Sequence, residues 1–357
     1  MNTRTSAAST STSAFNWARS GLRRQPLFPI LLAMLVILSV SYSGFGATAN
    51  FRNIAVQASP LIISAVGMTF VIMTSGIDLS VGSMLFLAAA VETSPALIGE
   101  PAALVFPAVA VTGLIMGLAN GLGVGLTRVP ALIVTLATMQ VFRGAGGHIT
   151  GQQDINVPAS LRGIGTGSIL GLPVPILLAA VIALAGGLVF ARTSFGRYLQ
   201  AVGSNRDAAV NAGLPVRRVV IGAYAVAGLL AGIDALTETA RLGAVQPSIG
   251  QGYELTVITA VVLGGTSLFG GRGSITGTVL GSLLLSTVQT GLVFSGASPY
   301  VFDIVRGSVL LAAVLAAALR WRGLTDALRL TTRLRLTGRT PSGDAKAAPH
   351  PTTSALQ

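Results

Sequence analysis

The 357-residue chain contains no cysteine, one lysine and two histidines. Without cysteine it can form neither a disulfide framework nor a thiolate site. Its lysine, Lys346, follows Gly-Asp-Ala, so the chain lacks the Gly-x-x-x-x-Gly-Lys-Ser/Thr loop that holds nucleotide phosphates. His148 and His350 are too few for a histidine-based metal cluster or catalytic triad. The sequence therefore predicts no catalytic residue, no metal site and no ATP hydrolysis by this chain itself.

Charged residues are also scarce, at 10% of the chain against about 25% in soluble domains. Hydrophobic residues make up 52%, and the 44 glycines suit helices that pack closely in a membrane. Backbone groups in lipid must be hydrogen-bonded internally, so long apolar runs there form helices. We predict an all-α, polytopic membrane protein, a bundle of eight to ten transmembrane helices with broken or re-entrant segments.

Ten apolar segments support this prediction, and several approach the ~20 residues needed to cross the hydrocarbon core. The third, fifth and eighth are short or broken. The segments cover residues 27–44, 54–75, 79–98, 102–126, 131–147, 169–191, 219–240, 254–270, 274–295 and 300–319.

The positive charge is concentrated in three stretches between these segments. Residues 1–26, 192–218 and the region from Arg320 onward hold 16 of the 23 lysine and arginine residues. Cytoplasmic loops carry such an excess, and even numbers of predicted spans separate the three stretches. We therefore expect both termini in the cytoplasm and Glu92 in an outside loop. The net charge of +12 is an orientation signal, and no nucleic-acid partner is predicted.

This topology divides the chain into three parts. Residues 1–26 are expected to be a disordered cytoplasmic leader, and residues 27–320 the transmembrane domain, with a cytoplasmic loop at 192–218. Residues 321–357 form a basic cytoplasmic tail, disordered at its end. Two short stretches within the chain are similar, Ser80-Val81-Gly82 and Ser248-Ile249-Gly250, and each is followed by an apolar run. Transporters built from internal repeats show such similarity.

A polar break interrupts the second and third segments at Gly76-Ile77-Asp78-Leu79-Ser80-Val81-Gly82-Ser83. An ionisable group inside a membrane segment is costly and usually serves a pathway or a partner. Asp78 could accept hydrogen bonds from the hydroxyl groups of a solute. Alternatively, it caps a helix that begins at Leu79.

The loop 192–218 contains the sequence Ser204-Asn205-Arg206-Asp207, which has the Ser-x-x-Asp pattern of a capping box. Ala208 and Ala209 then favour a short helix, which Gly213 ends. A helix of seven or eight residues is marginal alone, so it is expected to rest on this domain or on a partner. The alternative is an ordinary basic loop.

Two further clusters follow the seventh segment. Gln246, Tyr253 and Glu254 lie together in an outside loop and suit a polar ligand or a docked receptor. On the preceding helix, Glu238 and Arg241 are spaced to pair locally. The glycine-rich stretch 264–273 lacks a lysine and is interpreted as close helix packing, not as a phosphate loop.

Several motifs together resemble one known family. They are Gly-Ile-Asp-Leu-Ser-Val-Gly at 76–82, Phe195-Gly196-Arg197, Ala201-Val202-Gly203, Ala240-Arg241-Leu242-Gly243, Tyr253-Glu254-Leu255 and Ala260-Val261-Val262-Leu263-Gly264-Gly265-Thr266-Ser267. In this order, over residues 30–319, they look like the ribose/xylose-type permeases of bacterial ABC importers, within the branched-chain amino-acid/ribose permease superfamily. Thr256 departs from the pattern, because an aspartate often follows Tyr-Glu-Leu there.

The resemblance implies a multi-pass permease of the bacterial inner membrane that translocates a small sugar, such as a monosaccharide. It implies three partners in the surrounding lipid: an ABC ATPase subunit that uses ATP and Mg, a second copy or homologous permease chain, and an extracytoplasmic sugar-binding protein. No cofactor is expected on this chain. The segment 203–214 would be the helix that couples to the ATPase, through Gly203, Ser204, Asn205, Arg206, Asp207, Ala208, Ala209 and Gly213.

The resemblance also places translocation-path candidates at the two polar regions, namely Asp78, Ser80, Ser83, Gln246, Tyr253 and Glu254. Two alternatives stay open at this point. A branched-chain amino-acid ABC permease would have the same architecture. An ion-coupled secondary transporter would use the carboxylates of Asp78, Asp234 and Glu238 as ion sites.

Overall fold

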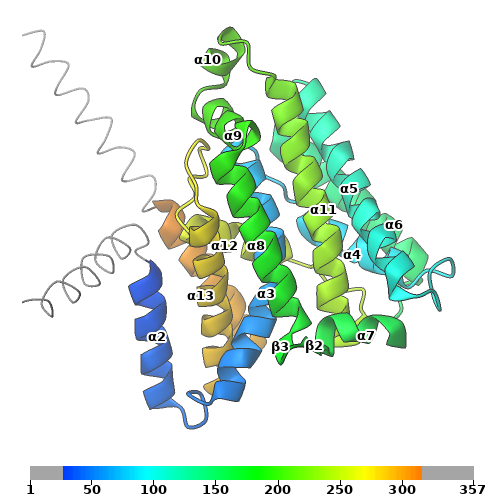
Figure 1. Cartoon of the computed structure of the whole chain (residues 1–357), viewed down its shortest axis with the longest axis vertical. Coiled ribbons are helices and arrows are strands. Elements are labelled where there is room, and N and C mark those ends of the chain that lie inside the picture. The colour runs from blue at the N-terminus through cyan, green and yellow to red at the C-terminus, as the bar shows by residue number, and fades with distance from the viewer. Residues whose placement is uncertain (1–26, 316–357) are drawn as a thin grey trace, which may run out of the picture. The chain divides into compact units, whose positions relative to one another are not determined.

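A computed structural model of the chain describes residues 27–315, and these are almost entirely helical (Figure 1). The predicted leader at 1–26 and the predicted tail at 321–357 lie outside the described residues. The first nine apolar segments correspond to α2 (Leu27–Ser41), α3 (Thr48–Met73), α4 (Val81–Glu92), α5 (Ala102–Leu126), α6 (Ala131–Thr150), α8 (Val174–Arg192), α11 (Val216–Leu242), α12 (Tyr253–Leu263) and α13 (Ile275–Phe294). The tenth is helical over residues 299–315.

Shorter elements connect these helices. Two strand pairs are antiparallel, β1 with β4 and β2 with β3. The connecting elements are β1 (Ile155–Asn156), α7 (Ala159–Thr166), β2 (Ser168–Ile169), β3 (Leu172–Pro173), α9 (Ser194–Ser204), α10 (Arg206–Asn211) and β4 (Ala244–Val245).

Five of the described helices are long and apolar enough to cross a membrane: α3, α5, α8, α11 and α13. Three apolar helices, α2, α4 and α12, are shorter. The predicted all-α, polytopic fold with broken segments is therefore confirmed. The third and eighth segments are short, as predicted, with 12 residues in α4 and 11 in α12. The fifth was expected to be short too, but α6 runs unbroken for 20 residues.

The long helices run between two ends of the bundle, which we name by the short helix found at each. Figure 1 shows α9 and α10 at one end, the α10 face, and α7 with β2 and β3 at the other, the α7 face. α3 ends at the α10 face, where Met73 accepts a hydrogen bond from Gly271. α11 runs the opposite way and ends beside α7, at the α7 face.

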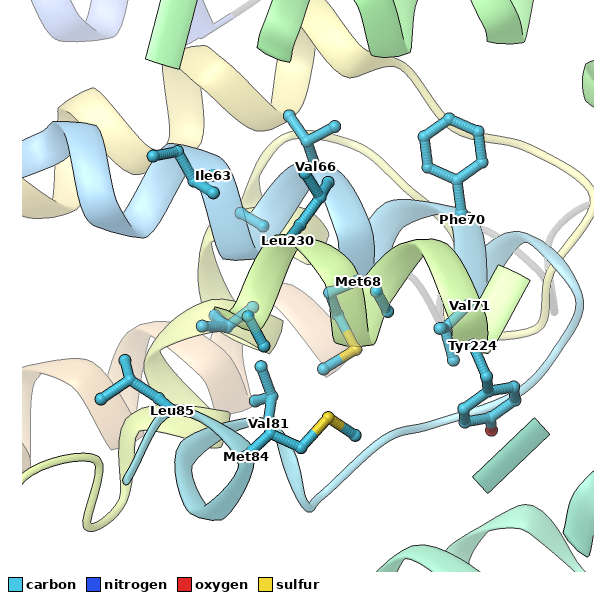
Figure 2. Close-up of a cluster of buried hydrophobic side chains, with 14 of the residues drawn as sticks. Ile63, Val66, Met68, Phe70, Val71, Val81, Met84, Leu85, Tyr224 and Leu230 are labelled. Atoms are coloured by element: carbon cyan, nitrogen blue, oxygen red, sulfur yellow. The ribbon is translucent and has the colours of Figure 1, made fainter. Parts of the chain in front are cut away.

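The centre of the bundle is a cluster of apolar side chains from α3, α4 and α11 (Figure 2). Val66 and Phe70 of α3, Met84 of α4 and Tyr224 of α11 are all buried in it. α2 packs separately, through Leu27 and Leu31, against Leu284 of α13. Because lipid is as apolar as these side chains, the helices are held by packing and hydrogen bonds more than by the hydrophobic effect.

α5 and α11 make the most intimate contact in this core, and glycine makes it possible. A Cβ atom on Gly228 of α11 would collide with the backbone of Gly113 and Gly117 of α5. The same is true in reverse, because a Cβ on Gly113 or Gly117 would meet the backbone of Gly228. The helices therefore touch backbone to backbone, as small-residue interfaces in membranes allow.

We predict that Gly228→Ala lowers the free energy of unfolding by about 1 to 3 kcal/mol, because the added methyl group forces α5 and α11 apart. Thermal unfolding of the purified protein in detergent measures the loss. Gly187→Ala on α8 is the matched control, since a Cβ there meets nothing within 4 Å. Equal stability of the two variants would contradict the proposed packing.

Candidate functional site

Two half-length helices begin at the same point in the bundle. α4 starts at Val81 and α12 at Tyr253, and Gly82 in the first turn of α4 lies against Gly250, just before α12. A Cβ on either glycine would collide with the carbonyl oxygen of the other. The two similar stretches, Ser80-Val81-Gly82 and Ser248-Ile249-Gly250, are therefore in contact in the structure.

The lengths of these helices place their crossing point near mid-membrane. At 1.5 Å per residue, the 12 residues of α4 span about 18 Å and the 11 of α12 about 17 Å. Each covers about half of a ~30 Å hydrocarbon core. α4 leads to the α7 face and α12 to the α10 face, so the connections 74–80 and 243–252 both re-enter the bundle. The loop at 243–252, which was expected to stay outside, thus folds back into the core.

The first re-entrant connection is closed by its own hydrogen bonds. Asp78 is 1% exposed, and its Oδ1 accepts from the backbone amide of Ser80 at 2.8 Å and from the Ser80 hydroxyl at 2.7 Å. Asn120 of α5 donates to Asp78 Oδ2 at 3.4 Å and to Ser80 Oγ at 2.7 Å. Ser83 is also buried. The alternative of Asp78 capping a helix from Leu79 is wrong in detail, because Ser80 occupies the N-cap position.

The second buried network surrounds Asp234, in the middle of α11. Its Oδ2 accepts hydrogen bonds from Ser64 of α3 and, at 2.8 Å, from the hydroxyl of Tyr253. Its Oδ1 has no partner among the described residues. Tyr253 thus ties the start of α12 to α11. The polar candidates Asp78, Ser80, Ser83 and Tyr253 all engage the interior of this chain.

Two other acidic residues, one on α11 and one on α4, also contact side chains of α11. Glu238 pairs with Arg241 at 2.7 Å, which confirms the local pairing predicted from their spacing. Glu92, expected in an outside loop, instead ends α4, is fully buried, and accepts a hydrogen bond from Thr239 at 2.8 Å. The expectation failed because α4 stops at this residue but still packs against α11.

Sequence reasoning did not identify two arginines that flank the second re-entrant loop. Arg143 of α6 donates to the carbonyl oxygen of Ile249 at 2.7 Å. Arg306, from the helix at 299–315, donates to Thr256 at 2.7 Å and pairs with Asp303 at 3.0 Å. Glu254 lies within electrostatic range of both guanidinium groups. Gln246 is exposed on the same loop. An isolated arginine inside an apolar segment was the only sequence signal for either residue.

A junction at the α10 face joins three segments that are far apart in sequence. Ser75, just after α3, donates to the carbonyl oxygens of Phe269 at 2.8 Å and Gly203 at 3.1 Å. Ser75 has the unusual φ of 63°, a left-handed conformation that turns the chain back into the bundle. A Cβ on Gly203 would collide with the carbonyl oxygen of Met73. The first re-entrant connection and the loop after α12 are thereby tied to the end of α9, three residues before α10.

α10 is a capped, exposed helix, although the cap is not the predicted one. The side chain of Asn205 accepts from the amide of Ala208 at 2.9 Å, so Asn205 replaces Ser204 as the N-cap. The helix has six residues where seven or eight were expected. Ala209 is buried against the bundle, whereas Ala208 is exposed and Val210 is 56% exposed. A cavity of about 360 Å³ opens beside it, lined by Thr74, Arg128 and Arg206 among others.

The glycine-rich stretch 264–273 packs closely, as the sequence indicated. Gly264 has no room for a Cβ because the backbone of Gly277 of α13 lies against it. Gly271 donates its amide to Met73 and lies against Ser204. Among the described residues, no group of three or more histidine, cysteine or acidic side chains could hold a metal ion.

The geometry is that of a multi-pass helical membrane protein with paired re-entrant half-helices, an arrangement that serves transport. Residues 50–314 match the family model described as the branched-chain amino acid transport system / permease component, and the chain belongs to this family. It is a multi-pass inner-membrane protein. No solved structure gives a significant match.

Curated relatives match over four fifths or more of this chain. It is 40% identical over 304 residues to the ribose import permease protein of Escherichia coli K12, which spans 84% of this chain and 95% of that protein. It is 38% identical to the ribose import permease protein of Bacillus subtilis 168, over 80% of this chain and 89% of that protein. The D-allose transport system permease protein of E. coli K12 is 31% identical, over 88% and 97%.

We predict that Asp78→Ala lowers the free energy of unfolding by about 1 to 3 kcal/mol, because it leaves polar groups of Ser80 and Asn120 without a partner. Asp78→Asn keeps an acceptor oxygen and should retain most of the stability. Thermal unfolding in detergent distinguishes them, with Asp154→Ala in an exposed loop as the control.

A contrary result would be wild-type stability in Asp78→Ala together with a loss of transport. That outcome would mean that the Asp78 carboxylate serves the translocated solute and not the fold.

Proposed function

We propose that this chain is the membrane-spanning permease subunit of an ATP-driven ABC importer, and that it translocates a small sugar, a monosaccharide. The observation that carries the proposal is the 40% identity to a protein named as a ribose import permease, over 95% of that protein's length. The relatives named for ribose and D-allose match over 84% and 88% of this chain, not over one motif. A paired re-entrant core suits a solute path because it brings polar backbone and side chains to mid-membrane depth.

The proposed transporter contains three other kinds of protein. A separate ABC ATPase subunit binds ATP and Mg and hydrolyses the ATP, because this sequence has no phosphate-binding loop with a lysine. A second copy, or a homologous permease chain, completes the membrane path. An extracytoplasmic binding protein delivers the sugar. This chain itself binds no cofactor.

The same proposal sets the orientation and the domain limits. Residues 27–320 form the permease domain, and both termini lie in the cytoplasm. The arginines of 192–218, which include Arg206 on α10, then lie on the cytoplasmic side as the positive-inside rule requires. The α10 face is therefore the cytoplasmic face, where an ATPase docks.

We assign the coupling role to the segment 203–214, with α10 at its centre. Its exposed face carries small and apolar side chains, Ala208 and Val210, that fit into a groove of another protein. Gly203, near the end of α9 and three residues before α10 begins, accepts a hydrogen bond from Ser75, whose hydroxyl group also contacts Phe269 in the loop after α12. Movement of α10 by the ATPase would therefore reach the crossing point through hydrogen bonds and backbone contacts.

The alternatives rest on weaker support. An amino-acid permease shares the family, but the relatives described above are named for sugars. An ion-coupled carrier would need carboxylates that are free to exchange a cation. Asp78 is bonded to Ser80 and Asn120, the Oδ2 atom of Asp234 accepts from Ser64 and Tyr253, and Glu238 is paired with Arg241. Ion coupling is not favoured.

We predict that the variant with Ala208→Arg and Val210→Arg loses the co-expressed ATPase subunit, with recovery falling about tenfold or more in affinity purification. Both side chains are exposed, so the substitutions place two charges on the docking surface without disturbing the bundle. Leu170→Arg is the matched control, because Leu170 is 98% exposed in the β2–β3 turn at the other face.

Equal recovery of the ATPase with the double variant would contradict the coupling assignment. If the wild type retains no ATPase, and sugar uptake into vesicles collapses with the ion gradient at constant ATP, the importer proposal itself is wrong. Competition of ribose uptake by leucine would instead favour the amino-acid alternative.

A further inference from the structure

Charged side chains gather at the crossing point of the two re-entrant segments. Arg143 holds the loop before α12 through the carbonyl oxygens of Ile249 at 2.7 Å and Pro247 at 3.4 Å. Arg306 lies at the other end of the loop, where its Nη2 would be 3.3 Å from a Cβ on Gly252. The two guanidinium groups come from different helices and flank one short segment.

The carboxylate of Glu254 is held between them without an ion pair. It is attracted by both arginines, yet neither of the ion pairs found among the described residues involves it. Its Oε2 lies beside Gly82, where a Cβ would approach to 2.9 Å. Glycine at this position thus leaves room for the carboxylate next to the start of α4. Its oxygens can accept hydrogen bonds from a solute.

The cluster continues onto an exposed surface. Gln140 is exposed one turn before Arg143 on α6, Gln251 is exposed on the loop, and Asp303 is 60% exposed beside Arg306. We call this surface the polar strip, defined as Gln140, Arg143, Gln251, Glu254, Asp303 and Arg306.

Lipid cannot solvate a surface of this kind. Residues 140 and 143 lie near the middle of the 20-residue α6, and Glu254 lies in the first turn of α12, which begins at mid-membrane. Charged groups at such depth face water, a partner or a solute. The adjacent residue Val141 of α6, by contrast, is exposed and apolar, as a lipid-facing surface requires.

The chemistry of the polar strip fits a neutral solute. Its two guanidinium groups are balanced by two carboxylates, so it has no net charge to attract an ion. Guanidinium groups only donate hydrogen bonds and ionised carboxylates only accept them, whereas a hydroxyl group does both. A solute with adjacent hydroxyl groups can therefore bridge Glu254 and either arginine.

We infer that Arg143, Glu254 and Arg306 form a mid-membrane binding subsite for a neutral, hydroxyl-rich solute, with Glu254 accepting from its hydroxyl groups. This inference rests on the proposed function, and it names the side chains that touch the sugar. The arginines are held in place beforehand. Arg143 also lies 4.8 Å from the ring centre of Phe86, and Arg306 is fixed by Thr256 and Asp303. Preorganised donors lose little entropy when a solute binds.

The test combines a substitution in the protein with the removal of a hydroxyl group from the sugar. The importer, reconstituted with its ATPase and binding protein, is assayed for uptake per ATP hydrolysed with ribose and with each monodeoxyribose. Glu254→Gln is nearly isosteric and should reduce ribose uptake per ATP by about tenfold. Removing the hydroxyl group that Glu254 contacts should cost the wild type a similar factor. Because both changes break one contact, their combination should cost no more than either alone.

The binding protein also discriminates among these sugars, but its effect is the same for the wild-type permease and for Glu254→Gln and cancels when the two are compared. Val141→Ala, on the apolar surface of α6, should leave uptake per ATP at the wild-type value. Arg306→Lys keeps the charge but loses the planar fork, and should lie between wild type and Glu254→Gln.

The inference is overturned if Glu254→Gln transports ribose at the wild-type rate per ATP. It is also overturned if, for every monodeoxyribose, the loss of uptake caused by the variant multiplies the loss caused by the missing hydroxyl group. It is also overturned if the variant no longer responds to the loaded binding protein, because Glu254 would then only position the loop. A wild type that hydrolyses ATP but moves no sugar would overturn the proposed function itself.

Discussion

Gly82 and Gly250 approach so closely that a Cβ on either would strike the backbone of the other. This contact fixes the depth at which both re-entrant segments stop and both half-helices start. A larger residue at either position would separate α4 from α12 and open the centre of the bundle. The rest of the interior follows from this constraint, because two polar connections must then be accommodated at a depth where lipid offers them no hydrogen bonds.

The two connections are accommodated differently. The first, at 74–80, is sealed by Asp78, Ser80 and Asn120, which satisfy one another and bury the carboxylate. The second, at 243–252, is held by Arg143 of another helix, α6, and leaves charged side chains on an exposed surface. The two re-entrant connections thus have unequal chemistry. One is a structural support, and we assign solute contact to the other. The Ser75 junction links the first connection and the loop after α12 to the end of α9, three residues before α10, where we propose that the ATPase acts.

The sequence was sufficient for features that depend on local pattern. Composition and apolar runs located all ten helical segments, and spacing on one helix paired Glu238 with Arg241. Features that depend on contacts between distant residues could not be found in this way. Arg306 and Arg143 are more than 150 positions apart in the sequence, and only the fold brings both to the same loop. The N-cap shift from Ser204 to Asn205 shows a similar limit, because both residue types are good caps and tertiary packing selects one.

The central claim is that a polar surface at mid-membrane depth faces a solute path, and the absence of cysteine makes a direct measurement practical. Single cysteines would replace Gln251 in the polar strip and Leu184, 69% exposed on the apolar α8. A water-soluble, membrane-impermeant thiol reagent is then applied to the assembled importer. The account predicts rapid labelling at position 251, slowed by the sugar, and little at position 184. Equally slow labelling at both positions would show that the polar strip is closed to water, and would contradict the account.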